Sequence, residues 1–357
     1  MTTSDRRPVI VLGGTGYVSG EILRLLVTHP SLRVAAVVST SADGGSVAAA
    51  FPQLAGTEAD SWSFVTLDAA IDGLKKDQII GILAATPHGA TAAMLDRVLS
   101  AAEAVGADAR AVDLSADFRY PDAASFERVY GQPHGAPGRL AQFTCGVPEH
   151  VVGVLNRHAA QPGCFTTAVS LAAYPFLAMG LVEPTVFACA VTGSSGSGRT
   201  PSAGTHHPDR HSDMRAYSPL VHRHEPEMRR LLAAANGGIA PDVDFVPHSG
   251  PFVRGIHATV RMTLVDEHPA DELVEAVNCF YETGPFVRAT TMPPRLRDVI
   301  GTNRACLGVA ARGSTLVVTS VIDNLVKGAA GGGIQWLNRL MGYSDDRGLI
   351  APGLGWY

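Results

Sequence analysis

A single cysteine at the start of an apolar run is the chain's best candidate for a nucleophile. Cys164 follows Pro162-Gly163 and opens a helix-forming stretch that reaches Tyr174, where Pro175 is expected to interrupt it. A thiol at a helix N-terminus lies among unpaired N–H groups at the positive end of the helix dipole, which lowers its pKa and favours the thiolate. The alternative is a small buried hydrophobe, because free cysteine is among the most buried residue types.

A group of histidines further along the chain supplies a candidate proton carrier. Five histidines lie between positions 206 and 224, and His222-x-His224 precedes a helix expected over 228–235. Their spacing is not the usual helical metal spacing and no cysteine pair accompanies them, so we predict no metal site. His222 fits better as an acid/base partner of Cys164, because imidazole titrates near neutrality. The alternative is a surface histidine in a loop.

An arginine that follows a buried strand offers a clamp for an anion. Ser115 and Arg119 come directly after a strand expected over 109–114. The guanidinium fork matches a carboxylate or a phosphate, so Arg119 is a candidate for holding an anionic group of a substrate. The alternative is an ion pair with Asp117 or Asp122.

A glycine turn near the N-terminus predicts a dinucleotide site. An apolar run over 9–12 ends in Gly13-Gly14-Thr15-Gly16, and an amphipathic stretch follows over 21–27. Strand, glycine turn and helix together place a pyrophosphate on a helix N-terminus. Gly13 and Gly16 would permit the turn and the close approach of the backbone, and Gly20 close helix–sheet packing. The alternative is a tight turn without a ligand. The predicted contacts in this turn are Gly13, Thr15, Gly16, Tyr17 and Val18.

Further cofactor contacts are expected where later strands end. The strand over 33–38 ends in Ser39-Thr40-Ser41, where the usual ribose-binding acid is missing, although Asp43 follows a few residues later. An acidic residue would repel a 2′-phosphate and a hydroxyl can donate to one, so the sequence favours NADP(H) over NAD. The expected contacts outside the glycine turn are Ser39, Thr86, His88, Gly193, Ser194, Gly196 and Asn324.

Composition limits the class of protein. A chain of 357 residues with 46% hydrophobic and 17% charged residues predicts a globular protein of two domains. A net charge of -5 provides no electrostatic footprint for nucleic acid or an anionic membrane. Five widely spaced cysteines without a CxxC pair suit a reducing cytoplasm. No apolar run is long enough for a membrane span.

The order of the predicted elements indicates an α/β protein. Strands and helices alternate in the first part of the chain, which predicts a doubly wound parallel sheet of the Rossmann type. Residues 120–160 are expected to be rich in loops. Alternating strands over 245–265, 305–309 and 315–322, with a helix over 271–283, predict a second, largely antiparallel sheet.

Five motifs, in this order, carry a resemblance to a known family. They are Gly13-Gly14-Thr15-Gly16-Tyr17, Asp113-Leu114-Ser115-Ala116-Asp117-Phe118-Arg119, Pro162-Gly163-Cys164, His222-Arg223-His224-x-Pro226-Glu227 and Asp323-Asn324-Leu325-Val326-Lys327-Gly328. Together they resemble the N-acetyl-gamma-glutamyl-phosphate reductases, the arginine-pathway members of the aspartate-semialdehyde dehydrogenase superfamily. The resemblance spans nearly the whole chain, and the later motifs are more specific than the glycine turn.

The resemblance implies a fold and a set of roles. It implies an NADP-binding Rossmann domain over 1–163 with 325–357, and an α+β catalytic and dimerisation domain over 164–324. It also implies NADPH, a homodimer or homotetramer, Cys164 as nucleophile and His222 as general acid/base. By matching position, the implied substrate-site residues are Ser115, Arg119, His224 and Glu227.

The implied reaction is the reduction of N-acetyl-gamma-glutamyl phosphate to the semialdehyde through a cysteine thioester. Residues 201–219 look closer to a sister branch that acts on carrier-protein-linked aminoadipyl or glutamyl phosphates, which is the main competing substrate. The acidic net charge favours the acetylated substrate, because an acidic carrier protein needs a basic docking surface. Two rival activities are a cysteine–histidine acyl hydrolase, which needs no nicotinamide site, and a non-catalytic NADP sensor, in which Cys164 only packs.

Overall fold

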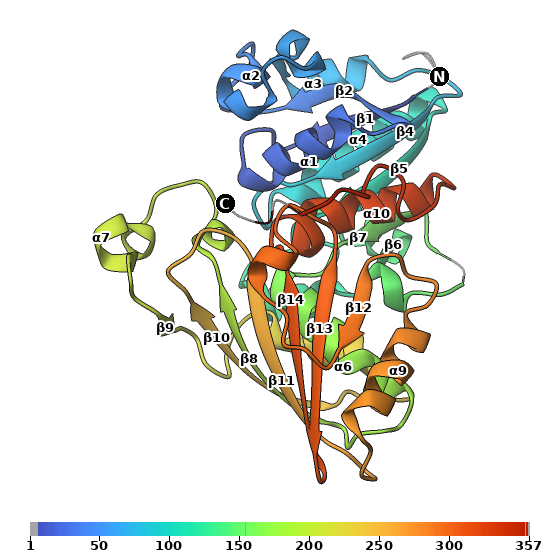
Figure 1. The fold of residues 1–357 in the computed structure, drawn as a ribbon. Helices are drawn as coiled ribbons and strands as arrows, with labels where there is room; N and C mark the ends of the chain where they lie inside the picture. The colour runs from blue at the N-terminus through green and yellow to red at the C-terminus, as the bar shows by residue number, and fades with distance from the viewer. Residues whose placement is uncertain (1–5, 154, 354, 356–357) are drawn as a thin grey trace. The chain divides into compact units, whose positions relative to one another are not determined.

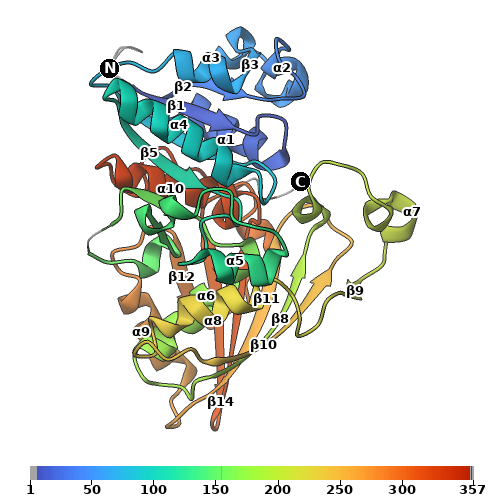
Figure 2. The same ribbon diagram turned by 180° about the vertical axis from the view of Figure 1, so that it is seen from behind.

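The computed structural model describes residues 6–153, 155–353 and 355, and its contacts divide them into two compact units (Figures 1 and 2). The first unit contains the described residues up to 146, together with 153–161 and 330–350. The second contains 147–152, 162–329 and the described residues after 350. The domain boundaries predicted from the sequence, at 164 and 324, are not tested by this division into units and stay a prediction.

The first unit is built on a sheet of seven strands in the order β3-β2-β1-β4-β5-β7-β6, and all of its pairings are parallel. Its strands are β1 (Arg7–Leu12), β2 (Leu32–Val38), β3 (Phe64–Val65), β4 (Ile79–Ala84), β5 (Asp108–Asp113), β6 (Phe143–Cys145) and β7 (His158–Ala160). Its helices are α1 (Tyr17–Val27), α2 (Val47–Ala50), α3 (Leu67–Asp72), α4 (Thr91–Val105), α5 (Ala123–Tyr130) and α10 (Gly331–Leu340). The predicted doubly wound parallel sheet is confirmed.

Helices cover both faces of this sheet, as a parallel sheet requires. On one face, Ile10 and Leu12 belong to a buried cluster with Leu67 of α3 and Leu95 of α4. On the other face α10 packs closely, because a Cβ at Gly81 of β4 would lie 2.9 Å from the Leu337 side chain. The burial on both sides explains why β1 and β4 read as continuous apolar runs.

The second unit contains a mixed sheet of seven strands in the order β12-β13-β14-β11-β8-β10-β9. Its strands are β8 (Thr185–Thr192), β9 (Arg215–Ala216), β10 (Asp242–Ser249), β11 (Ile256–Thr263), β12 (Val287–Thr290), β13 (Ala305–Arg312) and β14 (Thr315–Ile322). The β8–β10 and β12–β13 pairs are parallel and the other pairs are antiparallel. Its helices are α6 (Cys164–Ala178), α7 (His207–Arg210), α8 (Glu225–Ala233) and α9 (Ala270–Phe280).

Three of these helices pack on one face of the mixed sheet, as Figure 2 shows for α6, α8 and α9. The inward residues of β11 are buried and alternate with half-exposed or exposed ones, such as Arg261. Among the described residues, no helix covers the opposite face of the sheet, and Phe187 on β8 is 42% exposed there. Within the same part of the chain, no helix is both long and apolar enough to cross a membrane.

Helix α6 continues through Pro175 to Ala178, so the predicted interruption at this proline is wrong. A proline inside a helix has no N–H for the carbonyl four residues earlier, which here is Leu171 O. The Tyr281 hydroxyl donates to that carbonyl at 2.9 Å and replaces the missing donor. The same hydroxyl lies 2.8 Å from His150 Nε2, whose ring stacks on Tyr174 of α6.

Other predicted boundaries differ from the structure. The stretch 245–265 is not one strand, because β10 ends at Ser249 and Gly255, with φ of +108°, turns the chain into β11. Residues 120–160, predicted to be rich in loops, also contain α5, β6 and β7. Gly20 packs against a ring instead of the sheet, since a Cβ there would lie 2.7 Å from Phe51 Cε1. The last helix begins directly after a π-helical turn over Val326–Ala330.

A buried ion pair lies in the second unit. Lys327 Nζ, on the π-helical turn, is 2.5 Å from Glu149 Oε1, and the two side chains are 0% and 1% exposed. The ammonium group also lies 5.3 Å from the centre of the Phe286 ring. Removing two charges from water is costly, so each partner depends on the other for compensation.

Replacing Tyr281 with Phe is expected to reduce the free energy of unfolding by about 1–3 kcal/mol, because Leu171 O is left without a donor. The matched test is the same change in a Pro175→Ala protein, in which position 175 regains a backbone N–H that can bond to Leu171 O. The loss should be smaller in that background, as measured by urea unfolding of all four proteins. Equal losses in both backgrounds would show that the hydroxyl does not replace the helix donor.

Candidate active site

Cys164 is the first residue of α6 and lies at the N-terminus of a 15-residue helix. The preceding N-cap residue is Gly163, and no side chain caps the helix. Cys164 therefore stands at the positive end of the α6 dipole, in the first turn whose N–H groups have no partner within the helix, a setting that generally favours a thiolate. Cys164 is half-buried, so the sulfur is accessible to a ligand.

The turn before Cys164 is held by the start of α8. The Gly163 N–H donates to Glu227 Oε1 at 2.9 Å, and Glu227 is fully buried. His224 lies against the same glycine, because a Cβ at Gly163 would be 2.5 Å from His224 Nε2. Both residues therefore position the cysteine turn. Their predicted contact with a substrate stays a prediction.

The His222 ring lies in an aromatic surrounding beside the pocket that contains Cys164. Its centroid is 5.6 Å from that of Phe165, 5.5 Å from that of Phe245 and 5.5 Å from that of Tyr217. Burial, and to a smaller extent the Arg223 charge, lower the pKa of His222 to about 4. Its Nδ1 accepts the His224 N–H at 3.1 Å. The neutral ring therefore carries its proton on Nε2, and at neutral pH it is a hydrogen-bond donor.

The segment after β14 packs against Cys164 from another direction. A Cβ at Gly328 would lie 2.7 Å from Cys164 Cβ, so only glycine fits there without displacing the cysteine. Buried Asp323 holds this segment: Oδ1 accepts the Leu325 N–H at 2.9 Å, and Oδ2 accepts from Arg254 Nη2 at 2.9 Å. The Asp323–Gly328 motif thus forms one wall behind the sulfur.

Four predicted cofactor residues come together in the second unit. Asn324 Oδ1 accepts the Gly255 N–H at 2.7 Å, and Asn324 Nδ2 donates to Ser195 Oγ at 3.1 Å. Ser195 lies in a 3-10 helix over Ser194–Ser197 that follows β8. Gly193, Ser194 and Gly196 are therefore braced by Asn324, and Gly196 also lines the pocket.

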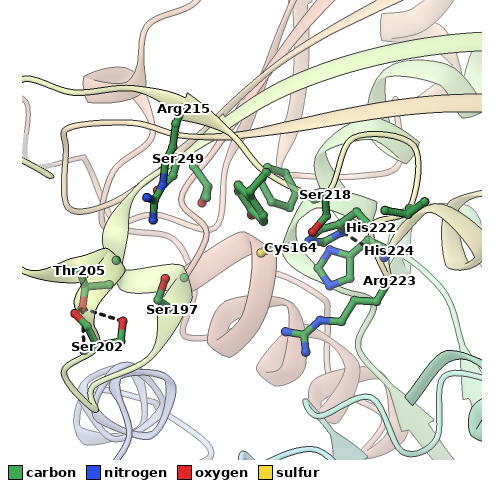
Figure 3. A pocket seen from close by; sticks show the side chains of 16 residues that line it. Cys164, Ser197, Ser202, Thr205, Arg215, Ser218, His222, Arg223, His224 and Ser249 are labelled. Atoms are coloured by element: carbon green, nitrogen blue, oxygen red, sulfur yellow. Dashed lines mark hydrogen bonds between the residues drawn. The ribbon is translucent and has the colours of Figure 1, made fainter. Parts of the chain in front are cut away.

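Cys164, His222 and His224 line a pocket of about 570 Å³ (Figure 3). Cys164 lies near its centre in the figure, between a group of hydroxyl residues and the His222–His224 segment. Two arginines, Arg215 and Arg223, line the pocket. The pocket thus combines a cysteine at a helix N-terminus, a hydrogen-bond donor and positive charge, an arrangement that would suit the attack of a thiolate on an anionic acyl compound.

The pocket residues that sequence reasoning missed include Arg215, Tyr217 and Arg223. Residues 200–220 read as an irregular polar excursion, whereas Arg215–Ala216 forms β9 at the edge of the mixed sheet. The local signal is the alternation in Arg215-Ala216-Tyr217, which is too short to distinguish from a loop. Arg223 stands between two selected histidines, and its charge alone does not separate it from a surface arginine.

The first unit gathers its predicted cofactor residues at the carboxyl ends of β1, β2 and β4. Gly13, Thr15 and Gly16 lie between β1 and α1, which opens with Tyr17 and Val18. Buried Ser39 follows β2, and its Oγ accepts the Ser41 N–H at 3.3 Å. The exposed hydroxyl groups of this turn belong to Thr40 and Ser41.

In the first unit, the loop after β4 is hydrogen-bonded to the loop after β5, which contains Arg119. Thr86 Oγ1 lies 2.5 Å from Thr91 Oγ1, and His88 Nδ1 accepts the Ala116 N–H at 3.0 Å. The Ser115 Oγ accepts the Asp117 N–H at 3.1 Å. Arg119 is 4% exposed, and its Nε donates to Gln161 O at 3.0 Å.

Two aspartates fix the shape of these loops. Asp113 Oδ1 accepts the Ser115 N–H at 2.7 Å, and Oδ2 accepts the Phe118 N–H at 3.0 Å. Burial, then the neighbouring Asp117 charge, raise the pKa of Asp113 to about 6. The Asp117 carboxylate accepts the Gly89 N–H at 2.7 Å and the Ala92 N–H at 2.9 Å, and so caps α4 from another loop.

The glycine turn fits a dinucleotide at one defined place. A Cβ at Gly13, whose φ is +89°, would lie 2.7 Å from Ala85 O, and one at Gly14 would lie 2.8 Å from Phe64 Cε1. At Gly16 the nearest such atom is Gly13 O at 4.0 Å, so this side of the backbone is open. Gly16 is the N-cap of α1, and no side chain caps that helix. Open backbone at a helix N-terminus suits a pyrophosphate.

The histidines show no metal-binding arrangement. In the part of the chain that the structure describes, no three His, Cys, Asp or Glu side chains form a cluster that could hold a metal ion. His206 Nδ1 lies 3.4 Å from Asp209 Oδ2 on the exposed α7 segment.

Comparison with known proteins identifies the two halves. The family "Semialdehyde dehydrogenase, NAD binding domain" matches residues 8–157, and "Semialdehyde dehydrogenase, dimerisation domain" matches residues 164–324. The chain therefore has a domain for a nicotinamide cofactor and a domain through which this family associates.

Close relatives share one name. An N-acetyl-gamma-glutamyl-phosphate reductase of Pseudomonas putida is 39% identical over 353 residues, covering 96% of this chain and 98% of the relative. That of Neisseria gonorrhoeae is 38% identical over 354 residues, covering 96% of both chains. That of Dehalococcoides mccartyi is 36% identical over 347 residues, again covering 96% of both.

Solved structures show the same fold at low identity. Aspartate semialdehyde dehydrogenase II of Vibrio cholerae, complexed with ASA, matches with a TM-score of 0.68 and 14% identity, covering 94% of this chain and 98% of that one. Aspartate semialdehyde dehydrogenase of Candida albicans with NADP matches with a TM-score of 0.60 and 15% identity, covering 97% of this chain and 100% of that one.

Replacing Arg223 with Gln is expected to raise the pKa of His222 above about 4, because a cation that disfavours imidazolium is removed. It should stay below 6.5, since burial is the larger cause. Between about pH 4 and pH 6.5, His222 is protonated in the unfolded chain and neutral in the folded protein. Its contribution to the free energy of unfolding therefore increases as the pH rises through this range. In Arg223→Gln the folded pKa of His222 moves closer to the unfolded value, so this pH range becomes narrower. The pKa can be measured by NMR titration of the His222 ring.

The matched control for this titration is Arg229→Gln. Arg229 lies on α8 and pairs with Glu225 and Asp242 at the surface, so its loss should leave the pKa of His222 unchanged. Equal shifts in both variants would mean that net charge, and not the neighbouring Arg223, controls the ring.

Proposed function

The chain belongs to the semialdehyde dehydrogenase family, among its N-acetyl-gamma-glutamyl-phosphate reductases, and we propose that it reduces N-acetyl-gamma-glutamyl phosphate to N-acetylglutamate 5-semialdehyde. It is an oxidoreductase of amino-acid biosynthesis, in the route to arginine. The observation that carries the proposal is Cys164 at the uncapped N-terminus of α6, in a pocket that also contains His222 and two arginines.

The Cys164 thiolate attacks the acyl carbon of the substrate. A carbon–sulfur bond forms, the carbon–oxygen bond to the phosphoryl group breaks, and inorganic phosphate leaves with its electron pair. The resulting thioester would be reduced by the hydride that a bound nicotinamide cofactor would supply. When the carbon–sulfur bond then breaks, the aldehyde is released and the thiolate returns.

His222 acts as the donor to the negative oxygen that forms in both tetrahedral steps. Its Nδ1 is occupied by the His224 N–H, so the proton available to the pocket is the one on Nε2. A neutral ring is able to donate this hydrogen bond without first taking up a proton. Donation of the Nε2 hydrogen bond to the oxyanion is the catalytic role that we propose for His222, with His224 and Glu227 positioning the cysteine turn.

We propose NADP(H) as the cofactor. The turn after β2 presents the hydroxyl groups of Thr40 and Ser41 and has no acidic residue at its first three positions, 39–41. A 2′-phosphate would meet donors there instead of a negative charge. The open backbone at Gly16 supports pyrophosphate binding at the N-terminus of α1.

The rival functions are less well supported. A cysteine–histidine hydrolase has no use for a nicotinamide domain, which this chain has. The relatives reported above carry the name of the reductase of the acetylated substrate, not of a carrier-linked one.

We propose that the enzyme works in the cytoplasm as a homodimer or homotetramer. The face of the mixed sheet on which Phe187 is exposed supports burial against another copy through the dimerisation domain. All five cysteines are free thiols, which suits a reducing compartment.

The proposed reaction is tested in the reverse direction, because acyl phosphates are labile. N-acetylglutamate 5-semialdehyde, inorganic phosphate and NADP should yield NADPH, followed by absorbance. Cys164→Ser should lower this rate by more than about 1,000-fold, since the thioester route is lost, while NADPH binding is retained.

Cys279→Ser provides the matched control, because Cys279 is an exposed thiol on α9 outside the pocket. Its rate should equal that of the unchanged protein. Substantial turnover by Cys164→Ser would refute the covalent route. An unchanged protein that binds NADP but oxidises no N-acetylglutamate 5-semialdehyde would refute the proposed substrate.

A further inference from the structure

Two arginines near the pocket form no ion pair with a carboxylate among the described residues. They are Arg210, which donates instead to Ser249 Oγ and Gly250 O, and Arg215. Burial first, and the Arg215 charge second, lower the pKa of Arg210, so the two guanidinium groups lie close enough to repel. The Arg210 guanidinium is taken up by Ser249 and Gly250, so Arg215 is the cation of the two that faces the pocket and is suited to an anion from outside the chain.

Arg215 is held in a defined place at the edge of the mixed sheet. It lies on β9, where it pairs with Ser249 of β10. Its guanidinium packs on the 3-10 turn over Ala203–Thr205, because a Cβ at Gly204 would lie 2.6 Å from Arg215 Nη2. That turn is itself closed by a hydrogen bond of 3.1 Å from the Ser202 N–H to Thr205 Oγ1.

The same wall of the pocket carries several hydroxyl groups. Figure 3 shows Arg215 on one side of Cys164 and Arg223 on the opposite side, with His222 and His224. The hydroxyl residues that line the pocket with Arg215 are Ser197, Ser202, Thr205 and Ser249. A guanidinium fork with neighbouring hydroxyl donors matches the two oxygens of a carboxylate.

The proposed substrate has two anionic groups, the phosphoryl group and the α-carboxylate. The position of Arg215 relative to Cys164 indicates which of them it binds. The phosphoryl oxygen is bonded to the carbon that Cys164 attacks, so a cation for the phosphoryl group must lie beside the sulfur. The α-carboxylate is several bonds further along the acyl chain. Figure 3 shows Arg215 across Cys164 from Arg223 and from His222, the proposed donor to the acyl oxygen, so Arg215 is the pocket arginine assigned to the far end of the acyl chain.

We propose that Arg215 binds the α-carboxylate of the acyl chain and thereby makes the enzyme specific for acyl phosphates that carry this group. The inference rests on the proposed reductase function and adds a residue that selects the substrate. It also gives a use to the segment 201–219, whose sequence departs from the rest of the resemblance.

The test compares two aldehydes in the phosphate-dependent reverse reaction. N-acetylglutamate 5-semialdehyde carries the carboxylate, and 4-acetamidobutanal has hydrogen in its place with the same acetamido and aldehyde groups. Arg215→Gln should lower kcat/KM for the first by about 10- to 100-fold and leave that for the second within about twofold. The KM for inorganic phosphate should not change.

Arg210→Gln is the matched control, since it removes the same charge from a residue that does not line the pocket. Arg210→Gln should change kcat/KM for the two aldehydes by the same factor. Arg215→Lys keeps the charge without the fork and should fall between Arg215→Gln and the unchanged protein. This variant decides the question if Arg215→Gln fails to bind NADPH and is therefore misfolded.

Three results would overturn the proposal. Equal losses with both aldehydes in Arg215→Gln would mean that Arg215 only supports the fold. A raised KM for phosphate would assign it to the phosphoryl group. Equal use of both aldehydes by the unchanged protein would mean that the carboxylate is not recognised. Failure of the unchanged protein on both aldehydes would instead refute the reductase function itself.

Discussion

The arrangement of the active site depends on the hydrogen bond from the Gly163 N–H to the buried Glu227 carboxylate. This bond joins the residue before Cys164 to α8, 64 positions later in the chain. Contact with His224 leaves no room for a side chain at Gly163. On another side of the cysteine, contact with Cys164 leaves no room for a side chain at Gly328. The sulfur is thus fixed at the start of α6 by elements from two distant parts of the chain, which is the preorganisation that the proposed nucleophilic role requires.

The charges in the pocket follow from the same packing. Aromatic rings around His222 exclude water, which keeps the ring neutral, and the His224 N–H fixes which nitrogen carries its proton. Positive charge comes instead from arginines, whose protonation does not change near neutral pH. The proposed hydrogen-bond donor and the proposed anion-binding groups are therefore different side chains, and the surroundings of each set its charge.

Much of this could be predicted from the sequence, where local patterns are strong. The apolar runs and glycine turn of the first unit predict a parallel sheet with a helix after each strand, and Cys164 after Pro-Gly predicts a helix start. The continuation of α6 through Pro175 could not be predicted, because the donor that replaces the missing N–H is Tyr281, far away in the chain. The role of Arg215 could not be predicted, because the alternation around a two-residue edge strand is too short to distinguish from a loop.

The buried ion pair of Lys327 and Glu149 constrains how these two positions can change during evolution. The two positions are 178 residues apart, yet loss of either partner leaves an uncompensated charge in an apolar interior. A lineage that replaces one of them must pass through a poorly folded intermediate unless the second changes in the same step. We therefore expect positions 149 and 327 to vary together among descendants of this chain, with a neutral pair of similar volume as the accessible substitute.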